Sequence, residues 1–240
     1  MNQLAGKVTL VTGGSRGIGL AVARAFVLRG AHVMITATTD SSIAGAVREL
    51  ESLSGAGTVH GRVADVRSYD TVQRMVDEAA SRLGGIDVLV NNAGVGVFAP
   101  VAQMSPTQWR EVIDTNLTGV YHCCHAALPH LRGRGGGWII NISSLAGTNP
   151  FADGAAYCAS KAGLNAFSEA LMQEVRHDGI RVTYVMPGSV NTGFTGRSTG
   201  QEWKLAPEDV AQVVLSLVEH PSRSLPSRVE IRPSQPPRKN

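Results

Sequence analysis

The chain of 240 residues has few cysteines and no long apolar run, and these shortages exclude several classes of protein. Its three cysteines, Cys123, Cys124 and Cys158, are an odd number without CxxC spacing, which argues against a disulfide framework and a zinc site. No segment approaches the run of about 20 apolar residues that a membrane helix needs. The N-terminus, Met1 to Gly6, has no apolar stretch long enough for a signal peptide. We therefore expect a cytoplasmic protein with reduced thiols and no membrane partner.

Charge of either sign is also scarce. Lysine and arginine number 22 against 19 aspartates and glutamates, so the formal net charge is only +3. No basic run lies on an expected helix face, and we therefore expect no nucleic-acid partner. Hydrophobic residues make up 43% and charged residues 17%, which is ordinary for a globular protein and unlike a disordered one. The length suits one domain, which we place over residues 1–240.

Short β-branched runs alternate with longer helical patterns along the chain. Because the expected strands are almost wholly apolar, they predict a parallel sheet covered on both faces. Right-handed crossovers make such a sheet doubly wound. The predicted fold class is α/β, a single-domain Rossmann fold. The expected strands are 8–12, 33–36, 59–63, 88–91, 138–142, 181–185 and 228–231, and the expected helices end near 29, cover 44–53, 72–83, 105–131 and 153–177, and start near 207.

A glycine-rich turn follows the first strand and opens the first helix. It reads Thr12-Gly13-Gly14-Ser15-Arg16-Gly17-Ile18-Gly19. Glycine lets the backbone approach a pyrophosphate closely, and the helix N-terminus offers free N–H groups and a positive dipole end. The spacing is GxxxGxG and not the GxGxxG of the general dinucleotide fingerprint, so a plain structural turn is the alternative. Its place directly after the first strand favours phosphate binding.

The end of the second strand bears on which dinucleotide would bind. The general fingerprint expects an acidic residue there, to hold the ribose 2′-hydroxyl. Ala37 and Thr38 occupy that place instead. Arg16 can supply charge to a 2′-phosphate, and Thr38 or Thr39 can supply hydroxyl donors. We expect NADP(H) to be preferred, with NAD(H) as the alternative, and we expect the nearby Asp40 to cap the next helix.

A tyrosine and a lysine lie four residues apart in the expected helix 153–177. Tyr157 and Lys161 therefore share one face of that helix. A phenol has a pKa near 10, and an ammonium beside it, together with an oxidised nicotinamide, lowers that pKa. Ser144 follows the fifth strand at the carboxyl edge, where open α/β sheets bind ligands, and Ser143 alternates to the other side. The group suits proton transfer to a developing alkoxide.

Jointly, these motifs resemble those of the short-chain dehydrogenase/reductase family. The matching positions extend from Thr12 to about Thr192, some three quarters of the chain. The pattern of Arg16 and Thr38 is similar to NADP-preferring members, notably bacterial 3-ketoacyl-carrier-protein reductases. The motifs that carry the resemblance are the glycine-rich turn, Asp65 in Val63-Ala64-Asp65-Val66, Asn91-Asn92-Ala93-Gly94, Asn116 in Thr115-Asn116-Leu117-Thr118-Gly119, Ser144, Tyr157, Lys161, and Pro187-Gly188 followed by Thr192.

The resemblance implies a role for each matching residue, and Asn91 to Gly94 would line the cofactor cleft. Asn116 would hold a water in a proton relay to Lys161, and Ser144 would orient the carbonyl. Tyr157 would be the general acid in reduction and the general base in oxidation, while Lys161 would also hold the nicotinamide ribose. The implied cofactor-binding residues are Gly13, Ser15, Arg16, Gly17, Ile18, Gly19, Thr38, Thr39, Asp65 and Val66 at the adenine, Asn92, Ala93, Gly94, Tyr157, Lys161, Pro187, Gly188, and Val190 and Thr192 at the carboxamide.

Purely structural roles remain open for several of these positions. Asn91 and Asn92 would then shape a turn at a strand end, and Asn116 would bond to backbone inside its helix. Asp65 would cap the helix that follows it. Histidines between positions 122 and 130 have no carboxylate partner at metal-ligand spacing, so we expect no metal site.

The function that we expect is transfer of a hydride between NADP(H) and a small carbonyl or alcohol, of the 3-ketoacyl type or a simple ketone. A non-catalytic nucleotide-binding regulator is the alternative, although it would not need Asn116, Ser144, Tyr157 and Lys161 together. The expected substrate lid, about 193–206, is short, which predicts broad substrate tolerance. The resemblance implies a homodimer or a homotetramer. The sequence after the last strand lacks the Asp-Gly-Gly frequent in relatives, many of which form a tetramer interface there, and this favours the homodimer.

Overall fold

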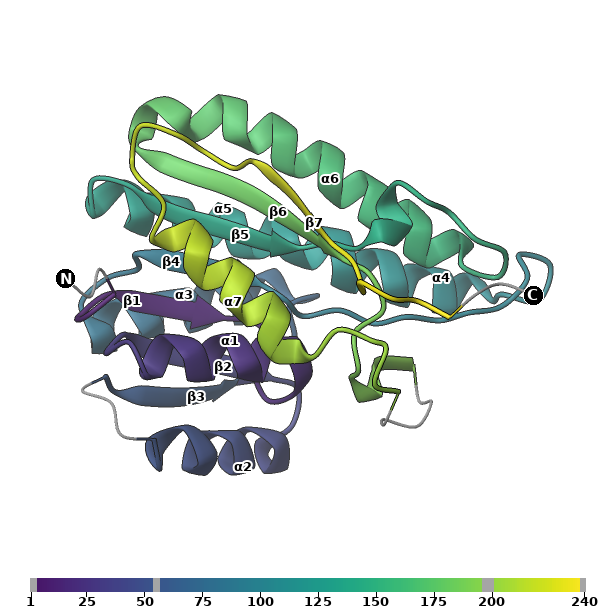
Figure 1. Cartoon of the computed structure of the whole chain (residues 1–240). Coiled ribbons are helices and arrows are strands. Elements are labelled where there is room, and N and C mark those ends of the chain that lie inside the picture. Colours follow the sequence, from purple (N-terminus) through teal and green to yellow (C-terminus); the bar gives the residue numbers. More distant parts are fainter. Residues whose placement is uncertain (1–3, 54–56, 196–200, 238–240) are drawn as a thin grey trace.

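The computed structural model describes residues 4–53, 57–195 and 201–237. In them, one parallel sheet has the strand order β3-β2-β1-β4-β5-β6-β7 (Figure 1). The order reverses between β1 and β4, which confirms the predicted doubly wound α/β fold in a single domain. The strands are β1 (Val8–Val11), β2 (His32–Ala37), β3 (Val59–Val63), β4 (Val88–Asn91), β5 (Gly137–Ile142), β6 (Ile180–Pro187) and β7 (Arg228–Ile231).

Helices cover both faces of the sheet (Figure 1). Residues of α1, α2 and α7 pack into one apolar cluster, and residues of α3, α5 and α6 pack into the other. Neighbouring strand residues divide between the clusters: Val11 and Ile35 join the first, whereas Leu10 and Met34 join the second. The helices are α1 (Gly17–Val27), α2 (Asp40–Glu51), α3 (Tyr69–Leu83), α4 (Pro106–Ile113), α5 (Gly119–Gly133), α6 (Ala155–Val175) and α7 (Pro207–Val218).

Hydroxyl side chains cap the N-termini of three of these helices, α2, α3 and α4. Thr39 caps α2 by accepting a hydrogen bond from Ser42 N, and Ser68 caps α3 in the same way. The expectation that Asp40 caps α2 is therefore wrong, because Asp40 is the first residue inside the helix. The alternative in which Asp65 caps α3 is excluded as well, since Ser68 lies directly before the helix and caps it.

The helix expected over 105–131 is divided into three parts. α4 ends at Ile113, a π-helical turn covers Asp114–Thr118, and α5 continues from Gly119. Asn116 lies in the middle of the π turn and is fully buried. π turns insert one extra residue into a helix and are frequent at functional sites. A 3.6-residue apolar pattern does not reveal this change of backbone hydrogen bonding.

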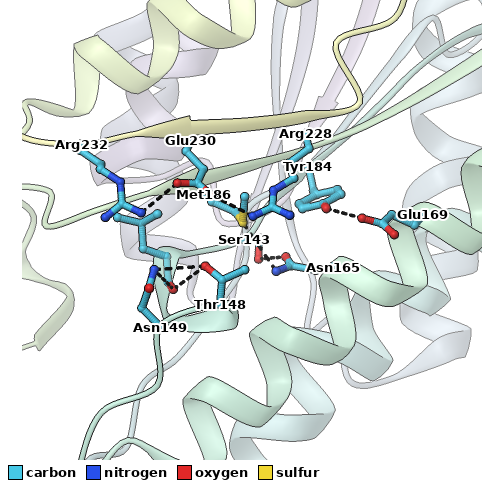
Figure 2. Close-up of polar contacts among 11 residues, drawn as sticks. Ser143, Thr148, Asn149, Asn165, Glu169, Tyr184, Met186, Arg228, Glu230 and Arg232 are labelled. Carbon is cyan, nitrogen blue, oxygen red and sulfur yellow. Dashed lines mark hydrogen bonds and ion pairs between the residues drawn. The ribbon is translucent and has the colours of Figure 1, made fainter.

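The edge strand β7 carries alternating charges. Glu230 accepts hydrogen bonds from Arg228 and Arg232, each at 2.8 Å (Figure 2). Charged side chains on an edge strand oppose unspecific pairing with other strands. The homodimer or homotetramer stays a prediction.

The cysteines lie in the interior of the fold. Cys123, Cys124 and Cys158 are buried free thiols. Burial raises the pKa of the Cys124 thiol to about 12 and that of Cys123 further still, so neither forms a thiolate near neutral pH. Within the described ranges, every helix is too short or too polar to cross a membrane.

Candidate active site

The glycine-rich turn is fastened to the end of β4. The Thr12 hydroxyl accepts hydrogen bonds from the backbone N–H groups of Asn92 and Ala93, both at 3.0 Å. The Asn92 amide donates to the carbonyl oxygens of Thr12 and Gly13, at 3.1 and 2.9 Å. Asn92 therefore shapes the turn, as its structural interpretation predicted, and it does so at the carboxyl edge of the sheet.

Close backbone packing requires two of the glycines. A Cβ on Gly13 would lie 2.9 Å from Ala93 Cα, and Gly13 has a φ of +61°. A Cβ on Gly19 would lie only 2.4 Å from the Asn92 amide nitrogen. Side chains are thus excluded from both positions, and the loop keeps its backbone bare.

The start of α1 suits a phosphate group. Its N-cap residue Arg16 has extended backbone and offers no side-chain cap, and the first turn of α1 contains no acidic residue. α2 and α3, in contrast, start with the capping hydroxyls of Thr39 and Ser68. An uncapped helix N-terminus offers N–H donors and partial positive charge to an anion. The turn therefore fits the diphosphate of a dinucleotide, with Ser15 half-buried and Ile18 packed on the core.

Candidate contacts for the adenosine end lie after β2 and β3. Thr38 and Thr39 are exposed at the end of β2, as is Arg16 in the neighbouring turn. The Thr39 hydroxyl already donates to Ser42 Oγ at 2.8 Å, which leaves Thr38 as the freer hydroxyl. Asp65 follows β3, and the hydrogen bonds from Arg67 hold the pKa of its carboxyl below the usual value.

Val66, the neighbour of Asp65, is held from α5. A Cβ on Gly119 would lie 2.7 Å from Val66 Cγ2, so the two residues pack closely. His122 Nδ1 lies 2.9 Å from the Val66 carbonyl oxygen. His122 therefore positions the backbone after β3.

α6 and the end of β5 bring the catalytic candidates together. The Lys161 ammonium donates to the Ile142 carbonyl oxygen at 2.8 Å and lies 5.8 Å from the centre of the Tyr157 ring. The Ser144 hydroxyl accepts from Ala146 N at 3.1 Å and also hydrogen-bonds Tyr157. Ser144, Tyr157 and Lys161 thus surround one place at the carboxyl edge of the sheet, as the motif predicted.

Burial shifts the pKa values of Tyr157 and Lys161. Burial raises it above the ordinary value of 10.0, and the hydrogen bond with Ser144 lowers it by less. Burial also lowers the pKa of Lys161 to about 8, and the ammonium is bound to a backbone carbonyl. In the protein alone, desolvation outweighs the hydrogen bond with Ser144, whereas the expected lowering of the Tyr157 pKa by Lys161 together with an oxidised nicotinamide stays a prediction.

Ser143 faces away from this place. Its hydroxyl donates to Asn165 Oδ1 at 2.5 Å and also lies 3.4 Å from the Lys161 carbonyl oxygen. Figure 2 shows Ser143 and Asn165 between the sheet and α6, where the Asn165 amide also contacts Met186. Ser143 therefore fastens α6 to β5, the structural part that strand alternation predicted for it.

Asn116 is used for backbone contacts. Its Oδ1 accepts from Val95 N at 2.8 Å, and its Nδ2 donates to the Val95 carbonyl oxygen at 2.9 Å and to Ser160 Oγ at 3.0 Å. Ser160 Oγ donates in turn to the Tyr157 carbonyl oxygen. Both amide hydrogens are thus committed, so a water at Asn116 would bind its remaining Oδ1 lone pair or its backbone. A Cβ on Gly94 would lie 3.3 Å from the same Oδ1.

The loop after β6 returns to the glycine-rich turn. Gly188, after Pro187 at the end of β6, donates its N–H to the Ile231 carbonyl oxygen at 2.8 Å. Val190 forms a parallel bridge with Leu205, and Thr192 Cγ2 would lie 3.1 Å from a Cβ on Gly17. The loop therefore spans the space between the turn and the catalytic group. The expected lid, 193–206, lies partly outside the described residues.

Sequence reasoning missed several residues that build the site. Ser160 links Asn116 to Tyr157, and Thr12 fastens the turn to β4. Thr12 directly follows the first strand, which is a usable signal, whereas a serine inside a helix has no distinguishing pattern. Asn91 was expected to line the cleft, but it is buried and donates to Asn141 Oδ1 at 2.8 Å. That expectation is wrong, because Asn91 is the last strand residue and faces the core.

The histidines of α5 bind separate partners. His125 Nδ1 lies 2.9 Å from the Tyr69 hydroxyl, and His130 Nε2 lies 3.1 Å from Asp77 Oδ1. Among the residues that the structure describes, no three histidine, cysteine or acidic side chains are grouped as metal ligands.

Comparison with known protein sequences identifies relatives of this chain. A family model described as short chain dehydrogenase matches residues 7–203. The 3-oxoacyl-[acyl-carrier-protein] reductase of Chlamydia muridarum is 36% identical over 242 residues, which cover 95% of this chain and 97% of that protein. 3beta-hydroxysteroid dehydrogenase 1 of Eggerthella lenta is 37% identical over 225 residues, covering 88% of this chain and 85% of that protein.

Solved structures give the same result. A metagenomic short-chain oxidoreductase in complex with NADP has a TM-score of 0.85 and 38% identity, covering 96% of this chain and 99% of that one. An alcohol dehydrogenase from the archaeon Thermococcus sibiricus, complexed with 5-hydroxy-NADP, has a TM-score of 0.89 and 28% identity, covering 97% and 99%. The matched segment, residues 7–203, contains the glycine-rich turn, Ser144, Tyr157 and Lys161. The chain belongs to the short-chain dehydrogenase family of oxidoreductases, which act on hydroxyl and carbonyl groups.

Proposed function

We propose that this protein reduces a small carbonyl compound with NADPH and catalyses the reverse oxidation. The observation that carries the proposal is the meeting of Ser144, Tyr157 and Lys161 at the carboxyl edge of the sheet, beside the uncapped start of α1. Bound NADPH supplies the hydride. A non-catalytic nucleotide-binding regulator would need the turn alone, without a buried lysine beside a tyrosine.

Each catalytic side chain has a defined task in this proposal. Ser144 and Tyr157 share a hydrogen bond, so both hydroxyls can hold one carbonyl oxygen. Because burial raises the pKa of Tyr157, the phenol keeps its proton at neutral pH and can donate it to the developing alkoxide. Oxidation requires the phenolate, which a charged Lys161 favours. The hydrogen bond between Asn116 and Ser160 joins the π turn to α6, the helix that carries Tyr157.

The cofactor contacts follow from the same geometry. We propose that the α1 N-terminus with Ser15, Gly17 and Ile18 holds the diphosphate, and that Arg16 and Thr38 bind the 2′-phosphate of NADPH. Arg16 is exposed at the turn, and the end of β2 presents Thr38 where a carboxylate would select NAD(H). The remaining proposed contacts are Gly13, Gly19, Thr39, Asp65, Val66, Asn92, Ala93, Gly94, Tyr157, Lys161, Pro187, Gly188, Val190 and Thr192.

A 3-ketoacyl compound or a simple ketone is the proposed substrate. The related reductase of Chlamydia muridarum is named for 3-oxoacyl groups, and the related dehydrogenase of Eggerthella lenta for a hydroxysteroid. The short lid supports tolerance of several ketones. We further propose a homodimer or homotetramer, which sedimentation equilibrium would distinguish.

Oxidation of NADPH and NADH in the presence of a panel of carbonyl compounds tests the proposal. We expect turnover with several ketones and a higher kcat/KM for NADPH. Arg16→Ala should lower kcat/KM for NADPH by about tenfold and leave that for NADH nearly unchanged, because the guanidinium would bind only the 2′-phosphate. The nearby Arg24→Ala serves as a control, since Arg24 pairs with Glu49. An equal loss with both cofactors would make Arg16 structural, and absence of turnover would refute the activity.

A further inference from the structure

Phenylalanine rings from three separate loops gather at Tyr157. The centre of the Phe98 ring lies 5.7 Å from that of Tyr157, and the centre of the Phe194 ring lies 5.8 Å from it. The Phe151 ring lies 6.0 Å from Phe98. Phe98, Phe151 and Phe194, here called the phenylalanine cluster, are three of the five phenylalanines in the chain. The cluster therefore concentrates aromatic surface at the proposed proton donor.

The cluster is accessible to a ligand. Phe98, Phe151 and Phe194 are 38%, 50% and 37% exposed, and they rank among the most exposed large apolar side chains that the structure describes. Exposed apolar side chains that gather in one place mark binding surfaces, whereas scattered ones are ordinary. Because this surface adjoins the ring of Tyr157, a ligand that contacts the phenylalanine cluster is placed to react at Tyr157.

Two glycines make room for the rings. A Cβ on Gly96 would lie 2.8 Å from the Phe98 ring and 2.9 Å from the Phe194 ring. A Cβ on Gly154 would lie 2.5 Å from the Phe151 ring. All three rings thus lie against bare backbone, and their close placement depends on these glycines.

A backbone hydrogen bond joins two of the loops. Ala99 N donates to the Asp153 carbonyl oxygen at 2.9 Å, which ties the loop of Phe98 to the loop of Phe151. Asp153 has a φ of +64°, a left-handed conformation that is uncommon for residues other than glycine. The turn between Phe151 and α6 is therefore specified locally, and the rings are placed before a ligand binds.

The segments that carry the cluster are uncharged. Residues 94–104, 145–152 and 189–195 contain no aspartate, glutamate, lysine, arginine or histidine, and the neighbouring Asp153 would repel an anion. A phosphorylated or carboxylated group would find no charged partner in these segments. The ligand group that matches them is neutral and apolar.

We infer that the preferred substrates are neutral ketones with an aromatic ring close to the carbonyl, held against Phe98, Phe151 and Phe194. This inference rests on the proposed carbonyl reduction at Tyr157. An aromatic ring in contact with other rings gains stabilisation beyond its buried area, through edge-to-face and offset geometries, by about threefold to tenfold in binding for each contact. Saturated rings of the same size gain only the stabilisation that comes from burying their apolar surface. A preference of that size is compatible with tolerance of several ketones.

Two matched ketones test the inference. In phenylacetone and cyclohexylacetone a methylene separates the ring from the carbonyl, so the two carbonyls react similarly and the rings have the same number of carbons. We expect kcat/KM with NADPH to be about tenfold higher for phenylacetone. Phe98→Leu and Phe194→Leu should each reduce that ratio by about threefold or more. Gly96→Ala should reduce it as well, because its methyl group displaces both rings.

Tyr121→Leu is the matched control. Tyr121 is an exposed aromatic residue of α5 whose ring lies against His122 and His125, and its replacement should leave the ratio unchanged. A wild-type ratio within about twofold of one, a preference for the cyclohexyl ketone, or a ratio that Phe98→Leu and Phe194→Leu leave unaltered would overturn the inference.

A binding measurement separates this inference from the proposed function. Calorimetry of the NADP-loaded protein with the two ketones gives their dissociation constants whether or not they are turned over. Tighter binding of phenylacetone without turnover would support the phenylalanine cluster and refute the proposed reduction. Turnover of both ketones with equal binding would support the reduction and refute the cluster.

Discussion

The two edges of the sheet differ in how far a buried charge is compensated by the groups around it. At the amino edge, Asp87 lies directly before β4 and is only 6% exposed. It accepts hydrogen bonds from Val8 N at 2.9 Å, from Lys7 at 3.0 Å and from Arg134 at 3.1 Å. Burial alone would raise the pKa of Asp87, yet these donors together hold it below its usual value. The charge is therefore fully compensated.

At the carboxyl edge, Lys161 is 5% exposed and its ammonium donates to a backbone carbonyl. Burial lowers its pKa to about 8. Stability is therefore reduced at the edge where we propose that the reaction takes place. A structural charge is surrounded by its own counter-charges, whereas a charge proposed to act on a ligand is kept available at a cost to the folded state.

The largest effect should come from the phenol at the carboxyl edge. We expect Tyr157→Phe to lower kcat by at least about 100-fold, the usual scale of a lost acid–base group, while NADPH affinity stays nearly unchanged. Steady-state kinetics and a cofactor-binding titration measure both. Tyr184→Phe is the control, because the Tyr184 hydroxyl binds Glu169 away from the catalytic group (Figure 2). Near-normal turnover of Tyr157→Phe would remove Tyr157 from its assigned role.

An intermediate effect is expected at the amino edge. Asp87→Asn should lower the free energy of unfolding by about 2 kcal/mol at pH 7, since Lys7 and Arg134 lose a buried anion and both are themselves partly exposed. Turnover should not change. Because the folded-state pKa of Asp87 is lowered, its contribution is present above the ordinary pKa of 3.8 and is lost as the pH falls below it. Denaturation at pH 7 and pH 3 checks the result: equal losses at both would contradict an ionic origin.

The smallest effect should have the opposite sign. A shift of the Lys161 pKa from 10.5 to about 8 corresponds to a cost of about 3 kcal/mol at neutral pH. Lys161→Met removes that cost together with the hydrogen bond to Ile142, so we expect a net gain of about 1 kcal/mol, or about 2–4 °C in Tm, and loss of activity.

The pH dependence of this gain identifies its cause. The penalty of a base with a lowered pKa is complete below about pH 8 and is relieved as the pH rises from 8 to 10.5. The difference in Tm between Lys161→Met and the wild type should therefore shrink between pH 7 and pH 10. A variant that is less stable than the wild type at pH 7 would show that Lys161 is compensated after all.

Much of the fold was determined by local sequence patterns. β3, β4 and β7 begin and end where the sequence predicted them. β4 is buried at every position, as a strand covered on both faces requires, whereas the edge strands β3 and β7 also contain polar, partly exposed residues. α2 starts four residues before the expected Ala44, since its first turn is exposed and has no apolar signal. Tyr157 and Lys161 were found by spacing, because residues four apart on a helix share a face whatever surrounds them. Ser144 was found by its place after the fifth strand, at the carboxyl edge of the sheet.

Other features were decided only when distant segments met. The sequence alone could not predict the raised pKa of Tyr157, because desolvation depends on the loops and helices that cover it. The π turn at Asn116 depends on Val95 and Ser160, which lie 21 and 44 residues away. The phenylalanine cluster likewise unites loops that are separated in the chain. The sequence by itself thus determined the sheet, its helices and the spacing of the catalytic motif, which follow from local periodicity. The tertiary structure decided burial, proton affinity and the surface offered to a substrate, since these depend on which segments exclude water from which side chains.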